Sequence, residues 1–284
     1  MRTRRFVQVD VFTAEAYLGN PLAVVCDGEG LSTHAMQRFA HWTNLSETAF
    51  LLAPSNPAAD YRVRIFTPTV ELGFAGHPTL GSCHAWLLGG GVAKRSGLVV
   101  QECGAGLIRV RHSDQQLAFA APPLRRAGPV NEATVAQIAR VLNIETSAII
   151  DSQWVDNGPG WVAVMLRDAD AVLALKPAFV EGLDIGVVGM YPAGSPCAYE
   201  VRAFFAKDGG TVEDPVTGSL NASLAQWLLR TSRVVAPYTA SQGVALGRAG
   251  RVYISTEIDG ADNEGADVWV GGHCVTCVSG SVDL

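Results

Sequence analysis

Two stretches decide the fold: Phe74-Ala75-Gly76-His77-Pro78-Thr79-Leu80-Gly81-Ser82 and Glu213-Asp214-Pro215-Val216-Thr217-Gly218-Ser219-Leu220-Asn221. Superimposed, each has a polar residue before a proline, followed by glycine and serine at the same spacing. Each stretch runs into an apolar helical segment that ends in Trp-Leu-Leu, at Trp86 and at Trp227. We interpret the two stretches as one motif used twice.

Other segments repeat in the same order. Tyr61–Phe66 alternates as a half-buried strand does, and Tyr199–Phe204 keeps its Tyr, Val, Arg and Phe at the same spacing. The strand-like Asn20–Val25 has a similar counterpart at residues 160–164. The shared offset, close to half the chain length, indicates an internal duplication.

The duplication also predicts matching helices. Apolar residues at helical spacing predict a helix over Ser32–Thr43, with Ser32 as its N-cap. We expect a similar helix at Val135–Leu142. The sequence therefore predicts an α+β fold of two similar, pseudo-symmetric domains, each a sheet or barrel wrapped around a central helix that begins at the motif.

The expected domains are residues 1–121 and 129–274. A Pro-rich, charged segment at 122–128 is the expected linker. The terminal strand, at about 275–284, is a candidate to return to the first domain.

Composition narrows the class of protein. The chain has 284 residues, 48% of them hydrophobic, enough for two packed cores. Its net charge of −6 disfavours a nucleic-acid partner, because phosphate binding needs a basic surface. The basic start, Arg2-Thr3-Arg4-Arg5, leads into an alternating strand, and no segment is apolar over the length of a membrane span. We expect a cytoplasmic protein without a membrane partner.

The six cysteines are spread along the chain. Cys274 and Cys277, which follow His273, raise the alternative of a metal or redox site. We expect a strand over Val268–Val278, in which residues three apart point to opposite faces, and no second cluster completes a zinc site. The interpretation we favour is reduced, apolar cysteines and no metal.

The motif suggests an anion site. We expect each proline to open its helix, with Asp214 and, more loosely, His77 as the capping residue. Gly76 and Gly218 would let backbone amides approach a ligand at the positive end of a helix. Taken singly, each motif is better interpreted as only a capped helix start. Taken as a pair, they favour one site in which both face a small carboxylate or a developing enolate.

Three side chains are candidates for proton transfer. His77 and Asp214 occupy equivalent motif positions, a histidine–carboxylate pair suited to moving or orienting a proton. Glu47 enters an otherwise apolar strand, where burial would raise its pKa toward neutrality; a surface glutamate is the alternative. The repeat offset makes Ile185 its counterpart, so we expect one acid/base only. Ser219, in the first helical turn, is a candidate to contact a substrate carboxylate.

The sequence resembles the PhzF-like (phenazine biosynthesis-like) isomerases of the diaminopimelate epimerase-like fold. The matching segments run almost end to end: Val9–Phe12, Gly19–Val25, Asn44–Thr48, Phe74–Gly81, Glu213–Ser219, Ser241–Gly243 and Gly247-Arg248. The resemblance implies two similar domains with the site between them, a homodimer and catalysis without a cofactor.

The resemblance also implies roles. In the founding activity, trans-2,3-dihydro-3-hydroxyanthranilate is isomerised by moving a proton along its ring. By similarity, Glu47 would carry that proton, His77 and Asp214 would assist, and Ser219 with the backbone near Gly76 and Gly218 would bind the substrate.

Two alternatives remain. One is an epimerase or racemase of a small carboxylate; the related epimerases use paired thiols, where this sequence has Ala75 and Asp214, and Cys83 lies too far inside its helix to replace them. The other is a non-catalytic protein that binds a small molecule, which would have no need of a proton carrier such as Glu47.

Overall fold

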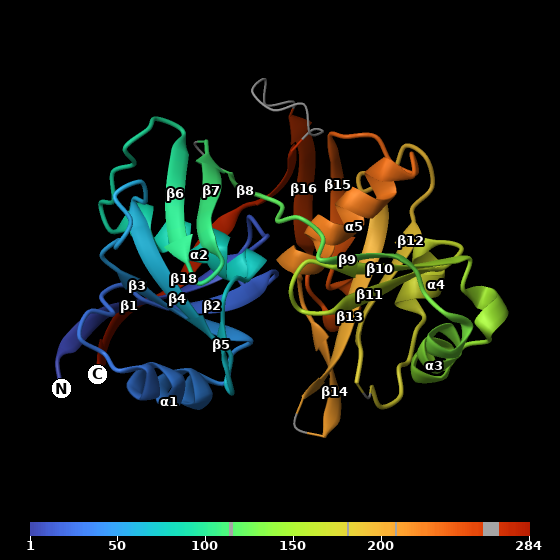
Figure 1. Ribbon diagram of the computed structural model, residues 1–284, viewed down its shortest axis with the longest axis horizontal. Coiled ribbons are helices and arrows are strands. Elements are labelled where there is room, and N and C mark those ends of the chain that lie inside the picture. The colour runs from blue at the N-terminus through green and yellow to red at the C-terminus, as the bar shows by residue number, and fades with distance from the viewer. Residues whose placement is uncertain (114–115, 181, 208, 258–266) are drawn as a thin grey trace. The chain divides into compact units, whose positions relative to one another are not determined.

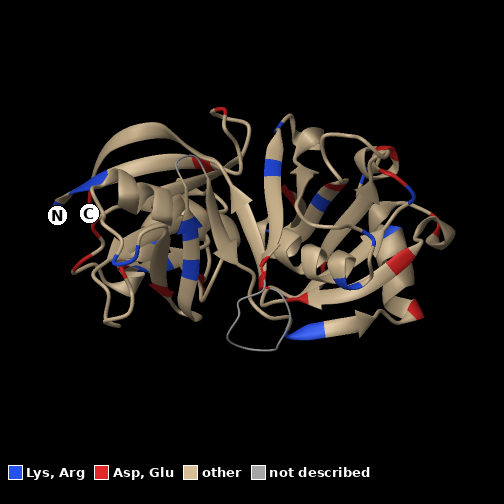
Figure 2. Ribbon diagram, turned by 90° about the horizontal axis from the view of Figure 1, so that it is seen from above, with Lys and Arg blue, Asp and Glu red and all other residues tan. Residues whose placement is uncertain are grey.

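The computed structural model describes residues 1–113, 116–180, 182–207, 209–257 and 267–284 (Figure 1). Their contacts divide the chain into unit 1, Met1–Ala120 with Gly271–Leu284, and unit 2, Ala121–Val270. Basic and acidic residues are interspersed within each unit (Figure 2). Among the described residues, every helix is too short or too polar to traverse a bilayer.

The sheet of unit 1 runs in the order β18–β1–β2–β3–β4–β6–β7–β8, and the short β5 also pairs with β4. The pairs β2–β3 and β4–β6 are parallel and the other pairs are antiparallel. The elements are β1 (Thr3–Val11), β2 (Asn20–Val25), α1 (Thr33–Thr43), β3 (Glu47–Leu52), β4 (Tyr61–Phe66), β5 (Glu71–Leu72), α2 (Gly76–Leu88), β6 (Leu98–Cys103), β7 (Gly106–His112), β8 (Leu117–Ala120) and β18 (Cys274–Asp283).

Helix α2 is the centre of unit 1. It contacts strands β1, β2, β3, β4, β6, β8 and β18, and most of its side chains are buried. At Gly81 a Cβ atom would come within 2.6 Å of the Leu22 side chain, so the glycine lets the helix lie close against β2. On the outer side of the sheet, α1 packs Met36, Phe39 and Ala40 against Phe50 and Phe66. Its N-cap is Ser32, as predicted, because the Ser32 hydroxyl accepts a hydrogen bond from the Ala35 amide.

The sheet of unit 2 runs in the order β9–β10–β11–β12–β13–β15–β16, and β14 also pairs with β13. Its elements are β9 (Arg126–Pro129), α3 (Glu132–Leu142), β10 (Asp151–Asp156), β11 (Trp161–Met165), α4 (Ala169–Leu173), β12 (Asp184–Met190), β13 (Tyr199–Lys207), β14 (Gly210–Asp214), α5 (Gly218–Arg230), β15 (Tyr238–Gln242) and β16 (Gly250–Glu257), with 3-10 turns at Thr146–Ala148 and Val244–Leu246. Strand β17 (Asp267–Gly272) begins in unit 2 and ends in unit 1.

Helix α5 takes the central place in unit 2. Its buried residues include Leu220, Leu224, Trp227 and Leu228, and it contacts β10 and β16. Gly186 of β12 lies directly against this helix, because a Cβ atom there would come within 2.5 Å of Leu220. A sheet around one buried helix in each unit confirms the predicted α+β architecture.

The order of helices differs from the prediction in one respect. α1 lies between β2 and β3, and the corresponding connection in unit 2, between β11 and β12, carries the short α4. The helix at Glu132–Leu142 precedes β10 and packs outside the sheet, against Val162, Val164 and Ile185. It is therefore not the counterpart of α1; the amphipathic pattern that the two helices share follows from covering a sheet face, not from a shared position.

The boundaries of the units also differ from those expected. The segment 122–128 was expected to be a linker, but it belongs to unit 2, where β9 pairs with β10 along Arg126–Pro129. The chain returns to unit 1 at Gly271, and β18 then pairs with β1 from Thr3 to Val11. The single strand expected over 268–278 is two strands, β17 and β18, which break at His273.

The repeated strand carries the same ion pair in both units. In β4, Arg64 donates two hydrogen bonds to Glu71, and in β13, Arg202 donates two to Glu213. Both guanidinium groups also lie near a phenylalanine ring of their own strand. The pairs differ in burial: the side chains of Arg202 and Glu213 are 7% and 10% exposed, against 19% and 38% for Arg64 and Glu71. In addition, Arg202 donates to the Val172 and Leu175 carbonyl oxygens.

This difference in burial gives a matched test of stability. Arg202→Met should lower the free energy of unfolding by about 3–5 kcal/mol, because it leaves the buried Glu213 carboxylate without its cation. Arg64→Met, at the equivalent place in unit 1, should cost less than about 1 kcal/mol, because solvent can hydrate Glu71. Urea denaturation of both variants measures the difference; equal losses would show that burial does not set the energy of this pair.

Candidate active site

In unit 1 the structure brings together Glu47 and His77. Glu47 is the first residue of β3 and pairs with Leu22 of the parallel strand β2. His77 is the second residue of α2. The His77 Nε2 atom lies 3.3 Å from the Glu47 Oε2 atom, and the two side chains are 5% and 16% exposed. A strand start and a helix start thus place a carboxyl group beside an imidazole at the end of the buried helix.

The imidazole of His77 is neutral. Burial lowers its pKa to about 3, because the charged form would lose its hydration. Its other ring nitrogen, Nδ1, lies 3.4 Å from the Nδ2 amide nitrogen of Asn20, the fully buried first residue of β2. An amide nitrogen can only donate, so Nδ1 is the acceptor and the ring proton is on Nε2. The N–H group of His77 is therefore on the nitrogen that faces Glu47.

This tautomer separates the roles of the two side chains. The His77 Nε2 and Glu47 Oε2 atoms form a close polar contact at 3.3 Å, not an aligned hydrogen bond. With a pKa of about 3, the imidazole is a poor proton acceptor near neutral pH. His77 is therefore placed to contact Glu47 and is disfavoured as a proton acceptor itself.

In unit 2 the second motif forms a buried hydrogen-bond chain. The Gln242 amide group donates to the Thr217 hydroxyl, which donates to the Asp214 carboxylate at 2.6 Å. The Gln242 carbonyl oxygen accepts hydrogen bonds from the Thr217 backbone amide and from the Asn221 side chain. Gln242 thereby fixes both Asp214 and the first turn of α5. The sequence shows Gln242 only as part of a short motif, since its partners are 25 and 21 residues away.

Ser219 is held from the side of β11. Its hydroxyl oxygen accepts a hydrogen bond from the Trp161 indole at 3.0 Å, and its carbonyl oxygen accepts one from the Asn157 side chain. Because the indole can only donate, the hydroxyl hydrogen of Ser219 stays available to a further acceptor. The sequence does not predict Trp161 or Asn157 as site residues, because they are 58 and 62 residues from Ser219 along the chain and come close to it only when the chain folds.

The helix starts correct the expected caps. α2 begins at Gly76 with Ala75 as N-cap, so Pro78 is its third residue and His77 lies inside the helix. α5 begins at Gly218 with Thr217 as N-cap, and Asp214 is the last residue of β14. Asp214 therefore binds the capping residue and is not itself the cap. Gly76 and Gly218 are the first helical residues, whose amides have no acceptor within the helix.

The strand register also corrects the counterpart of Glu47. Phe66 of β4 pairs with Thr48, and the equivalent Phe204 of β13 pairs with Ile185. Ile185 thus corresponds to Thr48, and Asp184, the first residue of β12, corresponds to Glu47. Unit 2 therefore keeps a carboxyl group at this position. The expectation that the two motifs face one site stays a prediction.

The thiols do not resemble a catalytic pair. Cys83 is fully buried in α2, and burial raises the pKa of its thiol, which disfavours the thiolate that acts as a base. Burial likewise raises the pKa of Cys274, and Cys274 and Cys277 both lie in β18 as free cysteines.

Comparison with known proteins identifies relatives over the whole chain. A profile of the family described as phenazine biosynthesis-like protein (PhzC-PhzF) matches residues 9–280. The chain is 35% identical to antisense-enhancing sequence 1 of Schizosaccharomyces pombe, with 99% of each chain covered. It is 33% identical to trans-2,3-dihydro-3-hydroxyanthranilate isomerase of Pseudomonas aeruginosa, again with 99% of each covered.

The fold has solved counterparts. The structure of a PhzF-family phenazine biosynthesis protein from Bacillus anthracis superimposes with a TM-score of 0.84, at 22% identity, with all of both chains covered. This likeness confirms the predicted epimerase-like fold. The named relatives support isomerase activity at the level of the family.

The burial of His77 predicts a pH dependence of stability. The pKa of His77 is about 3 when folded and near its ordinary 6.5 when unfolded, so only the unfolded chain takes up a proton between these values. The contribution of His77 should therefore be complete above about pH 6.5 and fall by up to about 1.4 kcal/mol per pH unit toward pH 3. Urea titrations at several pH values should give a shallower slope for His77→Asn. A slope equal to that of the unmodified protein would show that His77 is protonated in the folded state.

Proposed function

Because this chain belongs to the phenazine biosynthesis-like protein family, we propose that it is a cofactor-independent isomerase that moves a proton within a small cyclic or amino carboxylate. The reaction is similar to that named for the trans-2,3-dihydro-3-hydroxyanthranilate isomerases, which are 32–33% identical to this chain. Glu47 is the acid/base of this reaction.

The contact between Glu47 and the neutral His77 carries the proposal. A proton shift between two carbon atoms needs a group that accepts the proton at one carbon and returns it at the other. Glu47 is 16% exposed on its side chain, enough to meet a substrate, and its Oε2 atom lies 3.3 Å from the ring nitrogen that holds a proton. His77 stays neutral, so the abstracted proton remains on Glu47 until it is returned.

We assign substrate-binding roles to the helix starts. A substrate carboxylate, or the negative charge that develops as the proton leaves, is stabilised by backbone amides at the positive end of a helix, such as those at Gly76 and Gly218. The Ser219 hydroxyl oxygen accepts a hydrogen bond from the Trp161 indole, so the hydroxyl hydrogen can be donated to a substrate oxygen. Asp214, held by Thr217, orients polar groups of the substrate.

Replacement of Glu47 tests the mechanism. Glu47→Gln keeps the shape of the side chain but cannot take up a proton. With trans-2,3-dihydro-3-hydroxyanthranilate in deuterated water, NMR should show product formation and deuterium incorporation by the unmodified protein. The variant should lose at least about a hundredfold in kcat, the usual contribution of general acid/base catalysis.

The matched control is Glu145→Gln, which changes an exposed glutamate of unit 2 and should leave turnover unchanged. Full activity of Glu47→Gln would overturn the assignment of the acid/base. Absence of turnover by the unmodified protein would remove this compound as substrate, and other small carboxylates would then be screened by the same deuterium exchange.

A further inference from the structure

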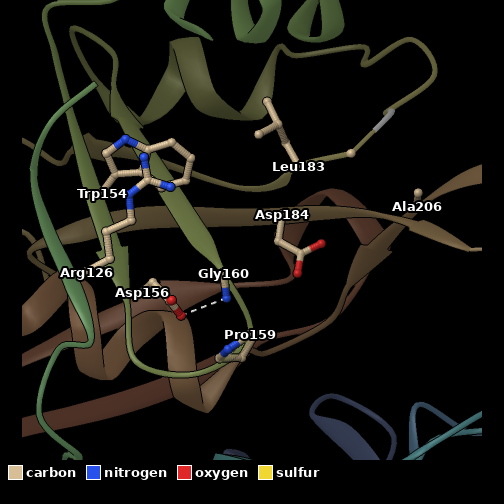
Figure 3. A pocket seen from close by; sticks show the side chains of 9 residues that line it. Arg126, Trp154, Asp156, Pro159, Gly160, Leu183, Asp184 and Ala206 are labelled. Atoms are coloured by element: carbon tan, nitrogen blue, oxygen red, sulfur yellow. Dashed lines mark hydrogen bonds between the residues drawn. The ribbon is translucent and has the colours of Figure 1, made fainter. Parts of the chain in front are cut away.

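Unit 2 contains a pocket that the proposed reaction does not use. It has a volume of about 350 Å³ and lies among β9, β10, β12 and the turn before β11 (Figure 3). Its charged and aromatic lining consists of Arg126, Trp154, Asp156 and Asp184. The volume is at the lower end of the range for small-molecule sites.

One side of the pocket is acidic. Asp156 is fixed by its Oδ1 atom, which accepts hydrogen bonds from the amides of Gly158 and Gly160. Asp184 is half-buried, and burial together with the charge of Asp156 raises its pKa to about 6. The two carboxylates therefore repel one another across a partly dehydrated space. A positively charged ligand group at this place would relieve that repulsion.

Arg126 is the cross-strand partner of Asp156, but its guanidinium group extends away along the strands onto an aromatic face. The Arg126 guanidinium carbon lies 3.3 Å from the centre of the Trp154 ring. In the view of Figure 3 this pair lies across the pocket from Asp184. Stacking fixes the guanidinium plane and leaves its N–H groups at the plane's edge, the geometry in which arginine binds a carboxylate.

We propose that this pocket binds a small zwitterion, whose ammonium group contacts Asp156 and Asp184 and whose carboxylate contacts Arg126. A simple amine would satisfy the acidic side but be repelled by Arg126, and a simple carboxylate would meet the opposite conflict. A metal ion fits less well, because the described residues offer two carboxylates here and no group of three or more metal-ligating side chains.

The duplication explains how such a site could arise. Asp184 stands where unit 1 has Glu47, at the start of the third strand of the repeat. In unit 1 this carboxyl group lies beside a histidine; in unit 2 its pKa is raised by burial and by the charge of Asp156. The same strand position therefore supplies a carboxyl group in each unit, with different neighbours.

Calorimetric titration of the full chain at pH 7 tests the proposal. The probes are glycine, β-alanine, 4-aminobutyrate and 5-aminopentanoate, which vary the distance between the two charges, with butylamine, butyrate and Ca²⁺ for comparison. At least one zwitterion should bind about tenfold or more tightly than butylamine and butyrate, since it alone pairs both sides. No saturation by any zwitterion at about 10 mM, or binding of Ca²⁺ in their place, would overturn the proposal.

Variants locate the bound probe. Asp184→Asn, Asp156→Asn and Arg126→Gln should each weaken binding by about tenfold or more. The matched controls Asp170→Asn and Arg140→Gln, exposed in α4 and α3, should not. Glu47→Gln should bind the zwitterion as the unmodified protein does, which separates this site from the proposed reaction. Equal binding by Arg126→Gln and the unmodified protein would overturn the carboxylate contact, and a loss with Glu47→Gln would place the probe elsewhere.

Discussion

Each unit depends on burying one helix on nearly all of its sides. A helix inside a curved sheet cannot have a polar face along its length, so its backbone groups must be satisfied by the helix itself and its charged chemistry must lie at an end. α2 and α5 largely follow this rule: apart from the hydrogen-bonded His84 and Gln226, their middles are apolar or small, and the polar residues of both motifs cluster at their first turns. The place of the candidate site follows from this constraint.

The starts of α2 and α5 hold their polar side chains with different sets of groups. At α2, a neutral imidazole spans the distance between a buried amide and a carboxylate, and the direction of its single proton is fixed by Asn20. At α5, an amide, a hydroxyl and a carboxylate form a chain that begins at Gln242. A shared backbone with different side chains lets the two copies of a duplicated unit differ in the chemistry at their helix starts.

The sequence predicted the parts of the structure that are local or repeated. The two motifs, the strands around Tyr61 and Tyr199, and the Ser32 cap follow from periodicity and short-range hydrogen bonds. The prediction for Glu47 and Ile185 was wrong by one residue, because the connections between repeated elements differ in length and a fixed offset cannot follow them; only the pairing with Phe66 and Phe204 sets the register. The contacts of Asn20, Gln242 and Trp161 join distant segments, so no local pattern shows them.

The last strand of unit 1 has a consequence for the order in which the two units fold during synthesis. β1 pairs with β2, which follows it closely, but its other edge is completed only by β18, whose residues are synthesised after all of unit 2. Unit 2 is continuous in sequence and can fold as it leaves the ribosome. The N-terminal unit cannot complete its sheet until β18 has been synthesised. Until then one edge of β1 is unpaired and can pair with a wrong strand.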